Sequence, residues 1–353
     1  MHTTGRTHSA YHQHHGFASQ QALRVLLLGL LLIVSQRSLA QISFSGYGAT
    51  GFKYYNRLEI IRYNSQVYYE GKFQANFTVN KQIEGQLDFR GNSEDHSIDF
   101  REFSAKLDYW KRFKVKMGNI RIPFGREQLI ERDEYYTVDH SFIHRSINNF
   151  GYGGRAVSFM AYYNYSDKRE DYPYAYYVSV FRNNSLVSGA AARFSYHAED
   201  WVYSVGGLYQ YQAGEETIGA EGLSADASYE AGSFSSSVEL FYVQDPVEGI
   251  RRRLAGLSDK VFAGGVKSIS ATQFKVDGEV IKTIEPVLGL AYYAPDMAAL
   301  KAHTLELVLA GNFYLDTDAR LRLDLDFLLT RNQFVSDYSI HDSRFAIELQ
   351  VRY

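Results

Sequence analysis

Several segments of this 353-residue chain alternate between polar and apolar residues. Positions 344–353 read RFAIELQVRY, so that all the odd-numbered residues are apolar and the even-numbered ones are mostly polar. Positions 320–327 read RLRLDLDF, and positions 72–79 read KFQANFTV. Successive side chains of a β-strand point to opposite faces. Each segment therefore predicts a strand with one polar face and one apolar face.

Two all-β architectures use strands of this kind. In a soluble sandwich, the apolar faces of two sheets pack together and the polar faces meet water. In an outer-membrane barrel, the apolar face meets lipid and the polar face lines a wet interior. Three features favour the barrel: strands of about ten residues, tyrosines near the segment ends, and a last strand that ends on Tyr353. We therefore predict an all-β fold, a transmembrane antiparallel β-barrel in the outer membrane of a Gram-negative cell.

The alternating segments number sixteen. They span 43–56, 67–79, 83–90, 100–109, 112–122, 154–165, 174–182, 190–197, 201–212, 223–229, 233–244, 260–270, 287–293, 302–314, 319–331 and 343–353. Long outer loops should alternate with short inner turns, and they mostly do, with exceptions at 166–173 and 271–286. The longer of these two turns contains the hairpin signal Asp277-Gly278. All five prolines are expected in or beside the connections, because proline cannot donate to a strand ladder: Pro123, Pro173, Pro246, Pro286 and Pro295.

The longest break between alternating segments, at positions 123–153, is rich in charge. Its carboxylates are Glu127, Glu131, Asp133, Glu134 and Asp139, and its arginines are Arg126, Arg132 and Arg145, with Arg155 just beyond it. Sixteen strands enclose an aqueous lumen unless something fills it. We predict that this third outer loop folds into the lumen and narrows it, although an external, solvated loop is the alternative. The mixed charges do not choose between anions and cations.

The N-terminus resembles an export signal, with Arg24 before an apolar run at 25–34 and a cleavage site between Ala40 and Gln41. We predict a signal peptide at 1–40 and a single barrel domain at 41–353. The histidines of the leader would be removed with it, so we assign them no metal: His2, His8, His12, His14 and His15. The chain has no cysteine, which excludes disulfides and thiolate chemistry. Removal of the leader takes away three of the 37 basic residues and none of the 40 acidic ones, so the mature chain has a net charge of -6, which argues against a nucleic-acid partner.

Five short segments carry a family resemblance: DFREF at 99–103, FKVKMG at 113–118, PFGRE at 123–127, HRSIN at 144–148 and GYGGR at 151–155. In these segments the chain resembles the phosphate-selective porin O and P family. The resemblance implies a trimeric sixteen-stranded porin whose loop lysine and wall arginines bind phosphate or related anions. Arg145 stands where the family has its loop arginine. Gln128 stands where it has the anion-binding lysine, and Tyr68 and Tyr69 stand where it has paired wall arginines.

Our leading interpretation is a passive diffusion channel for small hydrophilic solutes, with anions such as phosphate among them. The channel would be a homotrimer in outer-membrane lipid, without enzymatic activity, cofactor or metal. The expected constriction and solute-binding residues are Arg126, Gln128, Arg132, Arg145, Arg155, Lys114 and Lys116. One alternative is a barrel enzyme with Ser141 as nucleophile and Asp139, His140 or His144 as partners. Another is a non-conducting structural barrel.

Overall fold

The computed structural model describes residues 41–56, 65–94, 96–164, 172–183, 187–212, 218–299, 302–331, 338–339 and 343–353. The predicted signal peptide, including Ala40 and the histidines before it, lies outside these residues. Gln41 is the first residue of the first strand.

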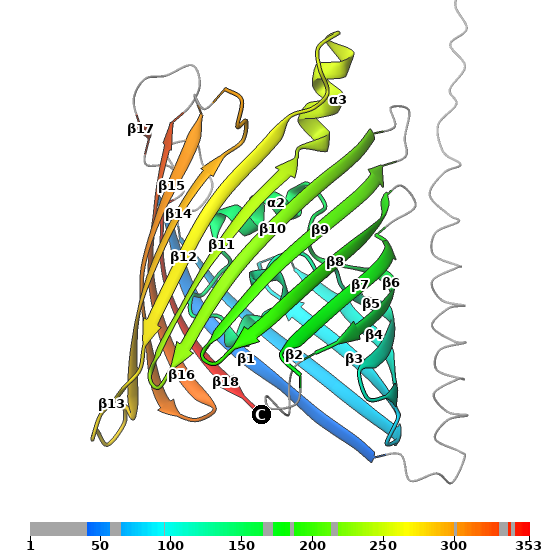
Figure 1. The fold of residues 1–353 in the computed structure, drawn as a ribbon. Helices are drawn as coiled ribbons and strands as arrows, with labels where there is room; N and C mark the ends of the chain where they lie inside the picture. Colours follow the sequence, from blue (N-terminus) through cyan, green and yellow to red (C-terminus); the bar gives the residue numbers. More distant parts are fainter. Residues whose placement is uncertain are drawn as a thin grey trace, which may run out of the picture.

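The described strands form one closed antiparallel barrel (Figure 1). β1 pairs with β2 on one side and with β18 on the other, so the sheet has no free edge. The sixteen long strands confirm the predicted number. They are β1 (Gln41–Asn56), β2 (Ser65–Asn80), β3 (Ile83–Asn92), β4 (Ser97–Trp110), β5 (Phe113–Arg121), β6 (Arg155–Tyr163), β7 (Tyr174–Arg182), β8 (Val187–Ala198), β9 (Trp201–Gln212), β10 (Ile218–Ala231), β11 (Phe234–Gln244), β12 (Phe262–Thr272), β14 (Thr283–Ala294), β15 (His303–Asp316), β16 (Ala319–Arg331) and β18 (Ser343–Arg352). Two-residue strands, β13 (Phe274–Lys275) and β17 (Tyr338–Ser339), pair with β14 and β16.

Burial along β16 is the reverse of burial in a soluble protein. Arg322 and Asp324 are 0% exposed, whereas Leu325, between Asp324 and Asp326, is 41% exposed. The same inversion holds in β18, where Glu348 is buried and Leu349 is exposed. Exposed apolar faces around a closed sheet are stable only in lipid. The chain is therefore an outer-membrane barrel, and the soluble sandwich is excluded.

The outward face of β9 also matches a bilayer in its order of residues. Trp201 and Tyr203 are exposed near one end of the strand, Val205 near its middle, and Tyr209 and Tyr211 near the other end. Amphipathic aromatic rings are enriched at the two membrane–water interfaces, with aliphatic residues between them. This strand therefore spans the bilayer from one aromatic girdle to the other.

The C-terminus and the β-hairpin that contains β13 lie at one end of the barrel, and α3 (Pro246–Leu254) lies at the other (Figure 1). None of the helices in the described ranges is both long and apolar enough to cross a bilayer. The end with the tight turns is the inner one by the usual rule for these barrels. α3 and the infolded connection between β5 and β6 therefore belong to the outer loops.

Most strand ends differ from the prediction by one to three positions, and two strand starts differ by more. β10 begins at Ile218, five positions before the predicted start, because Ile218 and Ala220 face inward and are buried. Their apolar side chains hide the alternation, because Ala220 packs in the cluster of the infolded loop and Ile218 lies beside Gly249 of α3. β14 begins at Thr283, which places Pro286 inside a strand and not in a connection. Pro286 is opposite Gly311 of β15, and on the other side of β14 it lies in the gap between the β12 and β13 pairings.

Candidate constriction and solute-binding site

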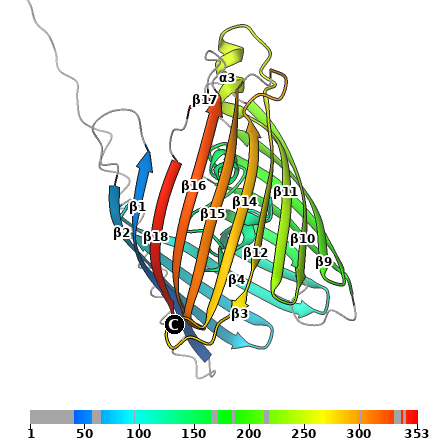
Figure 2. The same cartoon turned by 90° about the vertical axis from the view of Figure 1, so that its left-hand side faces the viewer.

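The connection between β5 and β6, residues 122–154, folds into the barrel, which confirms the predicted infolding (Figures 1 and 2). It contains two turns of 3-10 helix, η1 (Glu127–Leu129) and η2 (Arg132–Glu134), and one α-helix, α2 (Phe142–Asn149). An apolar side of the loop packs on the inner wall. The loop residues of this cluster are Ile122, Phe124, Ile143, Ile147 and Tyr152, and the wall residues include Phe181, Leu208, Phe241, Val243 and Tyr293.

The loop turns inward at Gly125, whose φ is +76°. A Cβ at this position would lie 2.8 Å from the carboxylate of Glu239 on β11. Glycine is therefore required both for the backbone conformation and for the close approach to the wall. The N–H of the next residue, Arg126, donates to the same Glu239 carboxylate. The PFG sequence thus encodes a backbone contact with β11.

Arg132 attaches the middle of the loop to the opposite wall. Its Nε lies 3.0 Å from both carboxylate oxygens of Glu70 on β2, and one terminal nitrogen lies 3.2 Å from Glu348 on β18. Tyr68 donates a 2.6 Å hydrogen bond to Glu348. The Arg132 charge is therefore neutralised by these buried carboxylates. Arg322 on β16 makes a further contact with the loop, because it donates to the carbonyl oxygen of Thr137 at 2.9 Å.

Two carboxylates of the loop, Asp139 and Glu131, form ion pairs with basic side chains of the barrel wall. Asp139 lies 3.0 Å from Lys53 on β1 and also pairs with Arg344 on β18. Burial acts to raise the pKa of Asp139, but Arg344 and Lys53 hold it well below its usual range. Glu131 lies 2.6 Å from Arg121 on β5. Burial opposes ionisation there too, but Arg121 and the neighbouring cations lower the Glu131 pKa to about 2.

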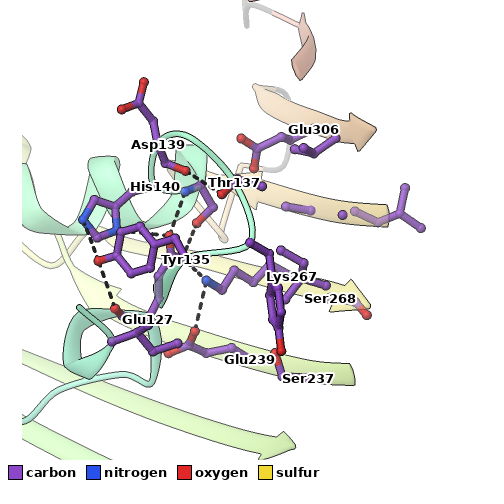
Figure 3. A pocket seen from close by; sticks show the side chains of 18 of the residues that line it. Glu127, Tyr135, Thr137, Asp139, His140, Ser237, Glu239, Lys267, Ser268 and Glu306 are labelled. Carbon is purple, nitrogen blue, oxygen red and sulfur yellow. Dashed lines mark hydrogen bonds and ion pairs between the residues drawn. The ribbon is translucent and has the colours of Figure 1, made fainter. Parts of the chain in front are cut away.

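A cavity of about 260 Å³ remains between the loop and the wall from β10 to β18 (Figure 3). Its carboxylates are Glu127, Glu134 and Asp139 from the loop, with Glu230, Glu239, Glu306 and Asp326 from the wall. Its arginines and lysine are Arg126, Lys267 and Arg344. Lys267 pairs with Glu127 and lies 3.3 Å from Glu239. The lining therefore carries more acids than bases.

The predicted site residues fall into two groups. Arg126 lines this cavity and a second one of about 310 Å³ beside β7 to β10. Arg145 is half-buried, with its guanidinium 3.8 Å from Asp326. Gln128 is buried and its amide donates to the carbonyl of Gly154 at 3.0 Å, joining the two ends of the loop. Their roles in solute binding stay predictions.

The other predicted cations lie on the wall of β5 and β6 and bind carboxylates. Arg155 lies 3.5 Å from Glu102, and Lys116 pairs with the same carboxylate. Lys114 lies 2.8 Å from Asp108. The structure does not bring these three residues into the cavity between the loop and β10 to β18.

Sequence reasoning missed the charged wall residues of the cavity, among them Lys267, Glu239 and Glu306. Their positions on the polar faces of β12, β11 and β15 were readable from the alternation. Nothing in the pattern indicated that the loop leans toward these strands.

The proposed nucleophile of the enzyme alternative makes no bond to an imidazole in the described part of the chain. The Ser141 hydroxyl donates to Glu127 at 2.7 Å and accepts from the backbone N–H of His144 as the cap of α2. Asp139 is held by Lys53 and Arg344. These contacts do not form a nucleophile–base pair.

The two loop histidines lie together beside Glu127. The rings of His140 and His144 are stacked with their centroids 4.1 Å apart. His140 Nδ1 lies 3.1 Å from Glu127, and its Nε2 lies 2.9 Å from the hydroxyl of Tyr135. Burial lowers the pKa of His140 to about 3 and that of His144 well below its ordinary value. Both rings are therefore neutral at pH 7.

No family model matches the chain, and no curated protein matches it. Solved structures do. An anion-selective porin from Comamonas acidovorans superposes with a TM-score of 0.63 at 12% identity, covering 89% of this chain and 99% of that one. The outer membrane channel DcaP of Acinetobacter baumannii gives 0.62 at 10% identity over 90% and 99% of the two chains. The trimer form of OmpT, an outer membrane protein of Vibrio cholerae, gives 0.58 at 11% identity over 89% and 99%.

These likenesses assign the fold. The chain is a sixteen-stranded barrel of the porin type, with an infolded third loop. The narrower resemblance to the phosphate-selective family is not confirmed by them and stays a prediction.

Proposed function

We propose that this protein is a passive diffusion channel for small hydrophilic solutes, with the loop at 122–154 as its constriction. The observation that carries the proposal is a polar inner wall whose lumen is narrowed by a loop bonded to it on two sides. Arg132 and Asp139 hold the loop to β1, β2 and β18, and Arg126 holds it to β11 through its backbone. A fixed loop leaves a passage of constant size, which is what size-limited diffusion requires.

We further propose that the passage favours cations over anions. Seven side chains with a carboxyl group and three basic side chains line the cavity beside the loop, and acidic rings attract cations. The anion preference predicted from the sequence has less support, because Arg132, Arg155 and Lys116 are all bound to carboxylates. Phosphate binding has the same weakness at Gln128, whose amide is directed to Gly154.

Enzymatic activity is not part of the proposal, because Ser141 donates to a carboxylate and not to a histidine.

We propose that the channel is a homotrimer, which is supported by the shared fold of the Vibrio cholerae protein that was solved as a trimer. Chemical cross-linking of the folded protein in detergent tests the trimer, and a single monomeric band would contradict it.

Recordings of current across a planar bilayer test whether the protein forms a channel and whether that channel prefers cations. We expect discrete current steps and a reversal potential in a KCl gradient that indicates cation preference. Glu239→Gln combined with Glu306→Gln should reduce that preference, because both carboxylates line the cavity. Glu248→Gln on α3 is the matched control and should leave it unchanged. Absence of steps would contradict the channel, and an anion-selective reversal potential with block by phosphate would restore the anion interpretation.

A further inference from the structure

Glu127, His140 and His144 form a compact group of metal-ligating side chains on the infolded loop. Each offers one ligand atom, and the three atoms lie within 4.8 Å of one another. Glu127 comes from η1, His140 precedes α2, and His144 lies in α2. Two imidazoles and a carboxylate are therefore brought together by one folded segment.

A second observation concerns His144 alone. Its side chain is 1% exposed, and Nε2 is buried without a hydrogen-bond partner among the described residues. Such an orphaned polar atom costs about 1–3 kcal/mol and is rare in native interiors. The backbone N–H of His144 is satisfied by the cap at Ser141, so the cost falls on the ring. A ligand that accepts the free lone pair would remove this cost.

The donor set points to a transition metal. Imidazole suits zinc, copper, iron and nickel, whereas calcium and magnesium prefer oxygen ligands. Two histidines and one carboxylate leave coordination positions open for water or another ligand. Metal ligation requires neutral imidazoles, and burial keeps both rings in that form at pH 7.

We propose that Glu127, His140 and His144 form a binding site for a divalent transition-metal ion beside the constriction cavity. The orientation of the carboxylate is already fixed, because Glu127 accepts hydrogen bonds from the backbone N–H and the hydroxyl of Ser141 at 2.8 and 2.7 Å. Hydrogen bonds of this kind orient metal ligands and tune the affinity of the site.

To bind an ion, Glu127 and His140 must exchange present partners for the metal. The groups that face these two residues allow that exchange. Lys267 pairs with Glu127 and would give up that contact, but Glu239 lies 3.3 Å from its ammonium and keeps it paired. The hydroxyl of Tyr135 lies against Nε2 of His140. His140 can therefore turn its Nδ1 from Glu127 to an ion that both residues share.

Zinc and cobalt titrations of the folded full chain in detergent test the site. We expect zinc to bind the wild-type chain in calorimetry, and cobalt to give the visible absorption bands of a histidine-ligated ion. His144→Gln and Glu127→Gln should each weaken zinc binding by at least about tenfold, the range that follows loss of a group supporting a metal. His197→Gln is the matched control, because His197 lines the other cavity. The leader histidines are common to all variants, so only differences between variants count.

Equal zinc affinity in the wild-type chain and both variants would overturn the proposal, as would a cobalt spectrum without histidine ligation. Heat-modified mobility in electrophoresis checks that each variant is a folded barrel, and His140→Gln replaces any variant that is not. Binding does not depend on conduction. A chain that binds zinc without conducting would contradict only the channel, whereas a chain that conducts and binds no zinc would contradict only the metal site.

Discussion

Two connections of this barrel are long, rich in charge and contain a short α-helix, yet their charges find partners in opposite ways. In the infolded loop, Arg132 binds Glu70 and Glu348, which are 62 and 216 residues away in the chain. In the connection that contains α3, Arg251 and Arg252 pair with Glu248, three and four residues away. The ion pairs of the infolded loop therefore connect it to the barrel wall, whereas those of the α3 connection lie mainly within that connection.

Burial separates the two loops as sharply. The side chains of Arg132 and Glu70 are 9% and 0% exposed, whereas Arg251 is 77% exposed. A buried pair leaves an uncompensated charge when one partner is removed, but an exposed pair is replaced by water. The same residue types therefore contribute differently to stability and to the shape of the lumen.

Deletion of each loop should give the largest contrast. Removing residues 127–146 should raise single-channel conductance severalfold, because the segment that fills the lumen is lost. Removing residues 247–257 from the α3 connection should leave conductance unchanged. Planar-bilayer recordings compare the two deletions, and equal conductance of both would mean that the infolded loop does not limit the current.

Single arginines provide the next contrast. Arg132→Met should lower the free energy of unfolding by about 3–5 kcal/mol, because the buried network would lose the cation that joins Glu70 to Glu348, and each carboxylate would keep a single basic partner, Arg90 and Arg322. Arg251→Met, the exposed counterpart, should cost at most about 1 kcal/mol. Urea titration followed by tryptophan fluorescence measures both. Similar losses for the two variants would show that the Arg132 network is not buried in solution.

Acid should act on the infolded loop through its histidines first. Burial lowers the pKa of His140 from its ordinary value of 6.5, which the unfolded chain has, to about 3 in the folded protein. The unfolded chain therefore binds the extra proton, and stability falls as the pH drops from 6.5 toward 3. Glu131, lowered from 4.5 to about 2, contributes stability that is lost only below pH 4.5.

Replacing His140 and His144 together by glutamine should remove the loss between pH 6.5 and 4.5. Urea titrations at several pH values compare this double variant with the wild type. Glu127, Tyr135 and Asp139 lie beside the histidines and are present in both proteins. Their contributions to the pH dependence of stability are therefore shared, and they drop out of the difference between the two profiles. Parallel pH profiles would contradict burial of the two neutral imidazoles.

The smallest effect is expected at the cap of α3. Asp245 accepts hydrogen bonds from the backbone N–H groups of Val247 and Glu248, both at 2.9 Å. Asp245→Ala should destabilise this helix by about 1 kcal/mol and leave conductance unchanged. Hydrogen exchange of the α3 amides measures the first effect, and unaltered protection would mean that the cap is not needed.

Much of the fold was predictable because its signals are local. The alternation at 320–327 places Arg322 inside and Leu325 outside, and the structure agrees. It failed at the start of β10, where Ala220 faces an apolar loop and not water. The infolding of the loop was predictable from its length, but the wall residues that the loop contacts were not.

The sequence by itself determined the strands, which face of each strand meets lipid, and the position of the infolded loop. Those properties follow from a period of two along the chain and from the places where it is interrupted. Only the tertiary structure decided that Arg132 is neutralised by Glu70 and Glu348, and that Lys267 and Glu239 share a cavity with Glu127. The physical reason is that these groups meet only after β1 pairs with β18 and the barrel closes, so the sign of the charge at the constriction depends on strand register and not on composition.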